Sequence, residues 1–142
     1  MQQRAYYRAE LALSQLETAL WLFAEGRDCA SVITLAGAAD EIFGNLLKAS
    51  GRDSSFESLK RAAAEIHLKI FGEPGSPKLI GDRANLARNS LKHWDVGNSE
   101  LVKFDLAQEA RDMLHRAIDN YWTLEQKLSP AMEAFQRADM ES

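Results

Sequence analysis

The regular spacing of apolar residues between positions 106 and 124 is the feature that most constrains the fold of this chain. Apolar side chains recur there every three or four positions: Leu106, Ala110, Met113, Leu114, Ala117, Ile118, Tyr121 and Leu124. This spacing places them along one side of an α-helix. No segment alternates apolar and polar residues with a period of two over a useful length, so no sheet is expected. We therefore predict an all-α fold.

Glycines, prolines and capping residues divide the rest of the chain into further helices. We predict helices over residues 3–25, 28–50, 54–71 and 82–94, a long fifth helix from Asp105, and a short last helix from Ser129-Pro130. Gly26, Gly51 and Gly72 follow the first three as stop signals. Ser54 with Glu57 and Asp105 with Gln108 match the capping box that opens a helix. Residues 73–77 and 95–99 are predicted loops because of their composition.

Length and composition indicate one domain over residues 1–142, an up-down bundle of about five helices plus a short C-terminal helix. Hydrophobic residues make up 46% of the chain and charged residues 27%. Such a mixture is typical of globular proteins. No run approaches the about 18 uninterrupted apolar residues of a membrane span, and the first residues lack the apolar core of a signal peptide. Cys29 is the only cysteine, so a reducing cytoplasm is the expected location, with no membrane contact.

The second predicted helix carries small and acidic residues inside an otherwise apolar stretch. Gly37 and Gly44 are seven positions apart and lie on the same side of the helix. Each glycine costs roughly 1 kcal/mol relative to alanine in a helix interior, so we expect another helix to approach closely on this side. Asp40 and Glu41 stand between the two glycines. They either point to solvent or cap a helix end, or one of them faces a polar cleft and hydrogen-bonds a basic residue there.

The fourth predicted helix separates into an apolar side and a polar side when it is projected at about 100° per residue. Its apolar residues are expected to face the core: Ala84, Ala87, Leu91 and Trp94. The polar side spans an arc of about 140° and contains Asn85, Arg88, Asn89, Lys92 and His93. This polar strip contains no acidic residue, although acidic residues outnumber basic ones by 21 to 17 in the whole chain.

These residue types suit phosphate chemistry. Arginine can hold phosphate oxygens with two parallel hydrogen bonds, and histidine can transfer a proton near neutral pH. Neither needs a metal ion, and the sequence has no His, Cys or Glu cluster at metal-ligand spacing, so we expect neither metal nor cofactor. The alternative is a solvated helix face with an Asn89–His93 hydrogen bond. The net charge of −4 speaks against a general nucleic-acid binder, which would need a local basic cleft.

The segment Arg88-Asn89-Ser90-Leu91-Lys92-His93 resembles the Arg-x4–6-His motif of the HEPN superfamily. Asn89 matches the polar residue that typically follows the arginine. The stretch from Leu35 to Phe43, followed by the segment from Ala87 to Trp94, is similar to small bacterial HEPN-like proteins. The resemblance implies a bundle in which two long helices precede the motif helix and another long helix follows it.

The resemblance also implies a function. It points to a metal-independent endoribonuclease, acting as a homodimer whose two motifs share a cleft, and to a toxin or defence component with an antitoxin or regulatory protein as partner. Arg88 would bind the scissile phosphate and His93 would act as acid or base, supported by a set of polar residues: Asn89, Lys92, Asn85, Asp40 and Glu41. Two alternatives stay open, a non-catalytic interaction or regulatory module and a nucleotide-binding module.

Overall fold

The computed structural model describes residues 2–142, and within that range the chain is helical with no strand. Its helices are α1 (Arg8–Ala24), α2 (Cys29–Ala49), α3 (Ser55–Phe71), α4 (Pro77–Ala84), α5 (Leu86–Lys92), α6 (Leu106–Glu125) and α7 (Pro130–Glu141). The predicted all-α class is therefore confirmed. The predicted helix over residues 82–94 is not, because α4 and α5 take its place.

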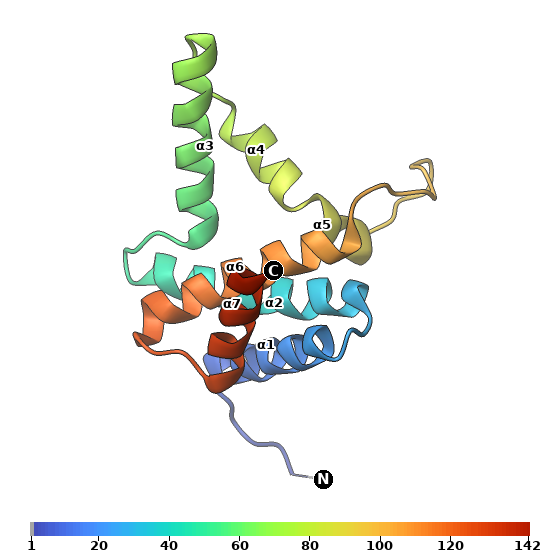
Figure 1. Ribbon diagram of the computed structural model, residues 1–142, viewed down its shortest axis with the longest axis vertical. Coiled ribbons are helices and arrows are strands. Elements are labelled where there is room, and N and C mark those ends of the chain that lie inside the picture. The colour runs from blue at the N-terminus through green and yellow to red at the C-terminus, as the bar shows by residue number, and fades with distance from the viewer. Residues whose placement is uncertain (1) are drawn as a thin grey trace.

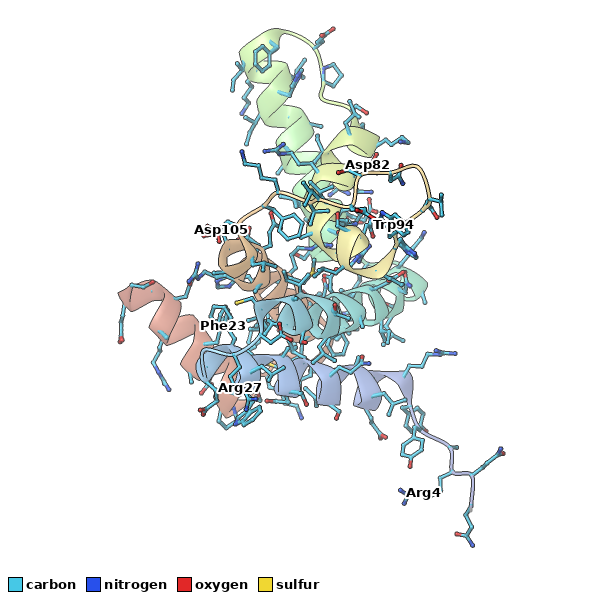
Figure 2. All side chains as sticks on the ribbon, turned by 90° about the vertical axis from the view of Figure 1, so that its right-hand side faces the viewer. Arg4, Phe23, Arg27, Asp82, Trp94 and Asp105 are labelled. Carbon is cyan, nitrogen blue, oxygen red and sulfur yellow. The ribbon has the colours of Figure 1, made fainter. Side chains whose placement is uncertain are left out.

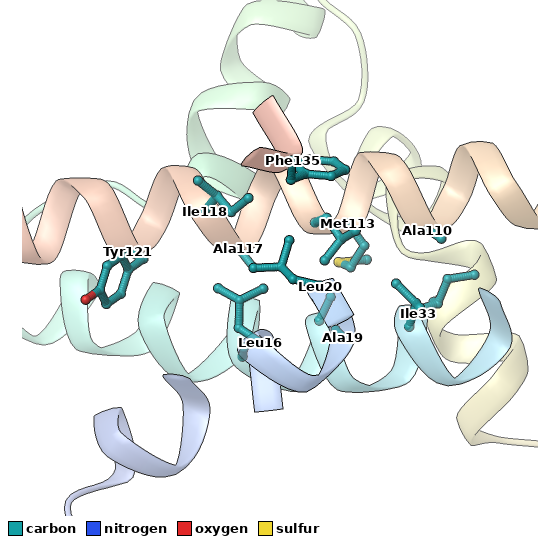
Figure 3. Close-up of a cluster of buried hydrophobic side chains, with 14 of the residues drawn as sticks. Leu16, Ala19, Leu20, Ile33, Ala110, Met113, Ala117, Ile118, Tyr121 and Phe135 are labelled. Carbon is teal, nitrogen blue, oxygen red and sulfur yellow. The ribbon is translucent and has the colours of Figure 1, made fainter. Parts of the chain in front are cut away.

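The hydrophobic core lies where α2 packs between α1 and α6, with α7 closing one side (Figure 1). α1, α2 and α6 bury most of the stripe that their apolar spacing predicts. Leu16 and Leu20 from α1, Ile33 from α2, and Met113 and Ile118 from α6 meet in this core (Figure 3). Phe135 of α7 covers them and packs edge-on against Phe23, with ring centroids 5.7 Å apart.

Three predicted helix starts carry the expected side-chain cap. The Ser54 hydroxyl accepts a hydrogen bond from the Glu57 N–H at 3.1 Å, and the Asp105 carboxylate accepts one from Gln108 at 3.0 Å. Ser129 caps α7 in the same way, with Pro130 in the first turn. Each cap satisfies a backbone donor that the first helical turn leaves without a partner. The predicted N-caps Ser54 and Asp105 are confirmed, although among residues 2–142 the Glu57 and Gln108 side chains contact Lys60 and Asp112 and do not complete a capping box.

The first helix begins later than predicted. Residues 2–7 are not helical, and α1 starts at Arg8. Tyr6 and Tyr7 are 54% and 78% exposed. No packing therefore offsets the entropy of ordering this segment as helix. Figure 2 shows Arg4 well away from the bundle. The predicted start at Gln3 is wrong by about one turn and a half.

The region predicted as one helix from Asp82 is two short helices that meet at Asn85. α4 starts earlier, at Pro77, where the Ser76 hydroxyl caps the Leu79 N–H at 3.3 Å. The break follows from a competing hydrogen bond, because an arginine of α6, Arg116, contacts both the Ala84 carbonyl and the Asn85 side chain. α5 then ends at Lys92, so Trp94 lies in the following loop and is 57% exposed (Figure 2). The prediction that Leu91 and Trp94 face the core is wrong.

α3 and α4 form an arm, residues 55–84, that projects from the bundle (Figure 1). None of residues 55–71 is buried, and the large apolar residues Ile66 and Ile70 of α3 are 57% and 66% exposed. The two helices touch through the side of α3 that carries Phe56, because an added Cβ at Gly81 would lie 3.0 Å from that ring. The outer side of α3 thus has no partner within residues 2–142.

α2 has the length and composition of a helix that could cross a membrane. Half of its most apolar 18-residue window is buried inside the bundle, and core helices of folded domains pass the same test. Its buried side chains, among them Val32, Ala36 and Phe43, belong to the core shared with α1 and α6. The apolar character of α2 is therefore used in packing.

Truncation of a core side chain on α6 should be costly. Leu114 is fully buried. Leu114→Ala therefore removes apolar contacts and leaves a cavity, and we expect the free energy of unfolding to fall by about 2–5 kcal/mol. Chemical denaturation followed by circular dichroism measures this change. The control is Leu68→Ala, at a site 46% exposed on the arm. It should change stability by less than about 1 kcal/mol. Equal effects of the two variants would contradict the core described above.

Candidate functional site

A polar cleft of about 470 Å³ lies where α2, α3, α5 and α6 meet. It falls within the usual size range of small-molecule sites. Its walls carry these charged and polar residues: Asp40, Glu41, Asn45, Lys48, Arg52, Asp53, Ser54, Glu57, Asn85, Arg88, Arg116 and Asn120. Gly44 and Phe56 complete the lining. Four of the predicted site residues, Asp40, Glu41, Asn85 and Arg88, are thus brought together by the fold.

A buried ion pair between α2 and α6 forms the floor of the cleft. The Arg116 Nη2 donates to the Asp40 Oδ2 at 2.8 Å, and the two side chains are 10% and 4% exposed. The other oxygen of Asp40 accepts from the Asn120 amide at 3.0 Å. The sequence left two interpretations of Asp40 open, and the one in which it faces a polar cleft and bonds a basic residue is correct. Glu41, the next residue, is half exposed at the rim.

Arg116 also fixes the start of the motif helix. Its Nη1 donates to the Asn85 Oδ1 at 2.9 Å and to the Ala84 carbonyl at 3.3 Å. Its guanidinium lies over the Phe56 ring, 4.8 Å from the centroid. One side chain of α6 therefore holds α2, α3 and the α4–α5 junction together. Its Nε is buried without a hydrogen-bond partner among residues 2–142.

Burial dominates the electrostatics of this ion pair. Desolvation raises the pKa of Asp40 above its ordinary value of 3.8, although the charges of Arg116 and Arg88 lower it. Desolvation likewise lowers the pKa of Arg116, against the stabilising charge of Asp40. Both shifts indicate that burial destabilises the charged forms by more than the attraction between the two charges stabilises them, as is common for buried ion pairs. The network is therefore sensitive to the removal of either partner.

Arg88 reaches the cleft across the surface of α2. An added Cβ at Gly37 would lie 2.7 Å from the Arg88 Cδ and 2.9 Å from its Cγ, so only glycine leaves room for the stem of this arginine. Glycine is used here for close approach, but of a side chain and not of the helix backbone that the sequence predicted for this side of α2. The Arg88 side chain is 18% exposed, with its Nη1 at 4.0 Å from carboxylate oxygens of both Asp40 and Glu41.

Those two distances lie beyond hydrogen-bond range, so Arg88 is held by charge and by packing of its stem. Arg116 occupies the near oxygen of Asp40, which leaves Arg88 as the second cation on a shared carboxylate. Among residues 2–142 the Arg88 guanidinium makes no hydrogen bond within the usual limits. Its donors are therefore available to an anion that enters the cleft.

Gly44 serves a second close approach further along α2. A Cβ there would meet the Ser54 Cβ at 3.3 Å and the Asn120 amide at 3.6 Å. The Asn120 Oδ1 in turn accepts from the Ser55 N–H at 2.7 Å, so the start of α3 is tied to α6 beside this glycine. The two glycines therefore let one side of α2 receive both Arg88 and the first turn of the arm.

The predicted polar strip does not stay together. Asn85 is buried, and Arg88 turns toward α2, whereas Asn89, Lys92 and His93 are exposed. His93 is the residue after α5 and has extended backbone dihedrals, φ −130° and ψ 137°. It is not among the residues that line the cleft. Asn85 and His93 leave the strip because the helix breaks at Asn85 and α5 ends at Lys92, whereas within α5 the Arg88 side chain is turned toward Gly37 of α2.

The expected acid-free character of the strip is also changed by tertiary contacts. The cleft gathers four carboxylates and four cations: Asp40, Glu41, Asp53 and Glu57, with Lys48, Arg52, Arg88 and Arg116. Its formal charge is therefore balanced. Two of the cations are already committed, since Arg116 pairs with Asp40 and Arg52 donates to the Thr123 carbonyl at 3.0 Å.

Arg116 and Asn120 are the site residues that sequence reasoning missed. They are four positions apart on the fifth predicted helix, and Asn120 falls seven positions after Met113, on the apolar stripe itself. A polar residue on a stripe that is otherwise apolar marks a buried polar contact. That signal was present, but its partner Asp40 lies eighty positions earlier in the chain.

No protein-family model, curated protein or solved structure matches the chain. The site is therefore interpreted from its own geometry. No group of three or more His, Cys, Asp or Glu residues within residues 2–142 is placed to hold a metal ion. His115 instead pairs with Asp139 of α7 at 2.7 Å, and Arg111 pairs with the same carboxylate at 2.9 Å.

Substitution of Gly37 by alanine should displace Arg88 while the fold persists. The added methyl group collides with the stem of Arg88. Alanine itself favours the helix by roughly 0.5–1 kcal/mol. We expect the Arg88 side-chain Nε–Hε signal in NMR spectra to shift, with thermal stability nearly unchanged. Gly44→Ala is the control, because its Cβ meets Ser54 and Asn120 and not Arg88. An unmoved Arg88 signal in Gly37→Ala would show that this packing is wrong.

The raised pKa of Asp40 gives a pH dependence with a definite sign. Protonated Asp40 is favoured in the folded state relative to the unfolded chain, so its contribution to stability is lost as pH rises through its folded pKa. The wild-type protein should therefore gain stability relative to Asp40→Asn as pH falls from neutral toward about 4. Urea unfolding of both proteins at several pH values measures the difference. A difference that is flat, or that shrinks with acid, contradicts the assignment.

Proposed function

We propose that this protein is a metal-independent endoribonuclease of the HEPN type, acting as a homodimer in which the Arg88 and His93 motifs of two chains serve one shared cleft. One observation carries the proposal: Arg88 is held at a polar cleft by packing on Gly37, with its guanidinium donors unused. An arginine fixed by its stem and left without hydrogen-bond partners is suited to receive a phosphate. A role in toxicity or defence is part of the same proposal.

In this mechanism Arg88 binds two oxygens of the scissile phosphate. Its bidentate hydrogen bonds replace the two loose contacts of 4.0 Å to Asp40 and Glu41. The guanidinium also stabilises the negative charge that grows on these oxygens in the transition state. Asp40 cannot follow Arg88 into the new contact, because Arg116 and Asn120 hold both of its oxygens. Asp40 and Asn85 thus act as positioning residues.

His93 supplies the proton chemistry. The RNA 2′-oxygen attacks phosphorus, and its proton goes to a general base. The bond from phosphorus to the 5′-oxygen breaks, and that oxygen takes a proton from a general acid. The products are a 2′,3′-cyclic phosphate and a 5′-hydroxyl end. Because His93 does not line the cleft of its own chain, the proposal places the His93 of the partner subunit beside Arg88 in the cleft that the two chains share.

Asn89 and Lys92 fit supporting roles on the outer side of α5. Both are exposed and lie on the helix between Arg88 and His93. Lys92, in the last turn of α5, can contact a neighbouring phosphate of the RNA chain. Asn89 can orient the histidine or a base. Glu41, half exposed at the rim, would have to release Arg88 when phosphate enters.

A second candidate is a non-catalytic module that binds a nucleotide in the same cleft. The observations that favour it are the balanced charge of the cleft and the position of His93 outside its walls. In that case Arg88 would hold the phosphate of a small ligand, and an antitoxin or regulatory protein would bind the nucleotide-bound form of this protein. The two candidates differ in one measurable respect, the cleavage of RNA.

The decisive experiment is an RNA cleavage assay in EDTA with purified protein. We expect wild-type protein to cut single-stranded RNA and leave cyclic phosphate ends, and Arg88→Ala and His93→Ala each to lower the rate about 100-fold or more. A DNA strand of the same base sequence, which lacks the attacking 2′-hydroxyl, should remain intact. Circular dichroism and thermal melting verify that both variants are folded.

Arg137→Ala and His67→Ala are the matched controls, since they remove the same residue types at positions outside the cleft. Both should cleave at the wild-type rate. Activity that survives Arg88→Ala and His93→Ala would identify a contaminating nuclease and reject the proposal. Stabilisation by nucleoside monophosphates, lost in Arg88→Ala and without RNA cleavage, would establish the second candidate.

A further inference from the structure

The outer side of α3 is an apolar stripe with no partner among residues 2–142. Five of its residues fall within an arc of about 100° of the helix: Leu59, Ala62, Ala63, Ile66 and Ile70. The large members are 42%, 57% and 66% exposed in chain order. α4 contacts a different side of α3, since Gly81 lies against Phe56 and Lys60, and Gly75 against His67. Figure 1 shows that the arm stands clear of the bundle, and the exposed fractions place the large side chains of this stripe in water.

Four residues of the stripe are arranged symmetrically about the bond between Ala62 and Ala63, and the fifth, Ile70, has Ser55 as its two-fold counterpart. Leu59 lies three positions before Ala62, and Ile66 lies three positions after Ala63. A two-fold axis through this point sets the two small residues of one chain against those of another. It also sets Leu59 against the partner subunit's Ile66. Small residues at a crossing point, with large ones on either side, allow two helices to approach closely and interlock.

The exposed stripe would form the apolar part of a dimer interface. Its three large side chains are 42%, 57% and 66% exposed, and a contiguous apolar patch on a monomer is often functional. A standard interface buries about 800 Å² per partner, of which somewhat more than half is apolar. The stems of neighbouring charged side chains supply the remainder.

We propose that the α3 stripe is the surface through which two copies of this chain associate, with the helices crossing at Ala62 and Ala63. The inference rests on the homodimer of the proposed function and names its contact. The occupant is a second copy because the stripe is complementary to itself under a two-fold axis, as an isologous interface requires. The pairing also explains how an arm without a buried residue on α3 is stabilised, since short helices need packing to persist.

The crossing point lies close to the cleft. Glu57 of α3 is a wall residue of the cleft. It is five positions from Ala62, which corresponds to about 8 Å along the helix axis. The first turn of α3 is tied to α6 through the bond from Ser55 to Asn120, so the cleft and the stripe share one rigid helix. Association through the stripe therefore fixes the position of each cleft relative to the partner subunit.

The test is sedimentation equilibrium of the full-length protein over a series of concentrations, without RNA. Wild-type protein should be a dimer, and Ile66→Glu, which places two charges in the interface, should weaken dimerisation about 100-fold or more. Ala62→Leu is the sharper variant. Leucine enlarges the apolar surface and is a good helix former, yet it blocks close approach at the crossing, so dimerisation should weaken about tenfold.

Met140→Glu and Leu11→Glu are the controls, because they place the same charge at exposed apolar sites on α7 and α1. Both should dimerise like the wild-type protein. A monomeric wild-type protein, or α3 variants that dimerise like the controls, overturns the proposal. Tighter association of Ala62→Leu also overturns it, because that result indicates unspecific apolar contact. Circular dichroism confirms that each variant is helical.

Association and cleavage are measured separately, so the two proposals can fail separately. A wild-type dimer that weakens as expected in the α3 variants but never cuts RNA supports the interface and rejects the endoribonuclease. A protein that cuts RNA through Arg88 and His93 while Ile66→Glu remains a dimer supports the function and rejects this interface. Loss of cleavage in monomeric Ile66→Glu, with Arg88 unmoved in NMR spectra, supports both.

Discussion

The buried ion pair between Asp40 and Arg116 is the interaction on which the arrangement of the site depends. Burying two charged side chains lowers the stability of the fold unless each is hydrogen-bonded. Asn120 bonds Asp40, and the Asn85 side chain and the Ala84 carbonyl bond Arg116. Those partners come from α6 and the α4–α5 junction, while Asp40 itself belongs to α2. A shift of any of these segments would leave a buried charge without its partner, so the pair fixes one relative position of the helices around the cleft.

The position of Arg88 follows from that pair. Arg116 takes the near oxygen of Asp40, so Arg88 approaches the same carboxylate only to 4.0 Å and is located mainly by its stem on Gly37. A cation that is held by packing but has no hydrogen-bond partner keeps its donors for a ligand. The proposed phosphate contact therefore has two physical causes. Arg116 binds the buried carboxylate of Asp40 more closely than Arg88 does, and Gly37 of α2 has no Cβ and so leaves room for the Arg88 stem.

The outer side of α3 is the second feature that bears on the site. In the single chain, the large side chains on the outer side of α3 are left in water, although their spacing is that of a helix with a buried side. The same helix begins beside Asn120 and borders the cleft, so whatever covers its outer side also sets the surroundings of Arg88. In the proposed dimer, assembly and site would thus be coupled through α3 by its position in the fold.

The sequence by itself determined the helical class, most helix ends, the core stripes of α1, α2 and α6, and the close approach at Gly37, because these depend on local periodicity, capping and backbone sterics. It also predicted that Asp40, Asn85 and Arg88 are site residues. Only the tertiary structure decided that Arg116 and Asn120 belong with them, that the helix breaks at Asn85, that His93 lies outside the cleft, and that the α3 stripe faces water. These outcomes depend on contacts between residues far apart in the chain, and local patterns carry no information about which distant carboxylate an arginine will meet.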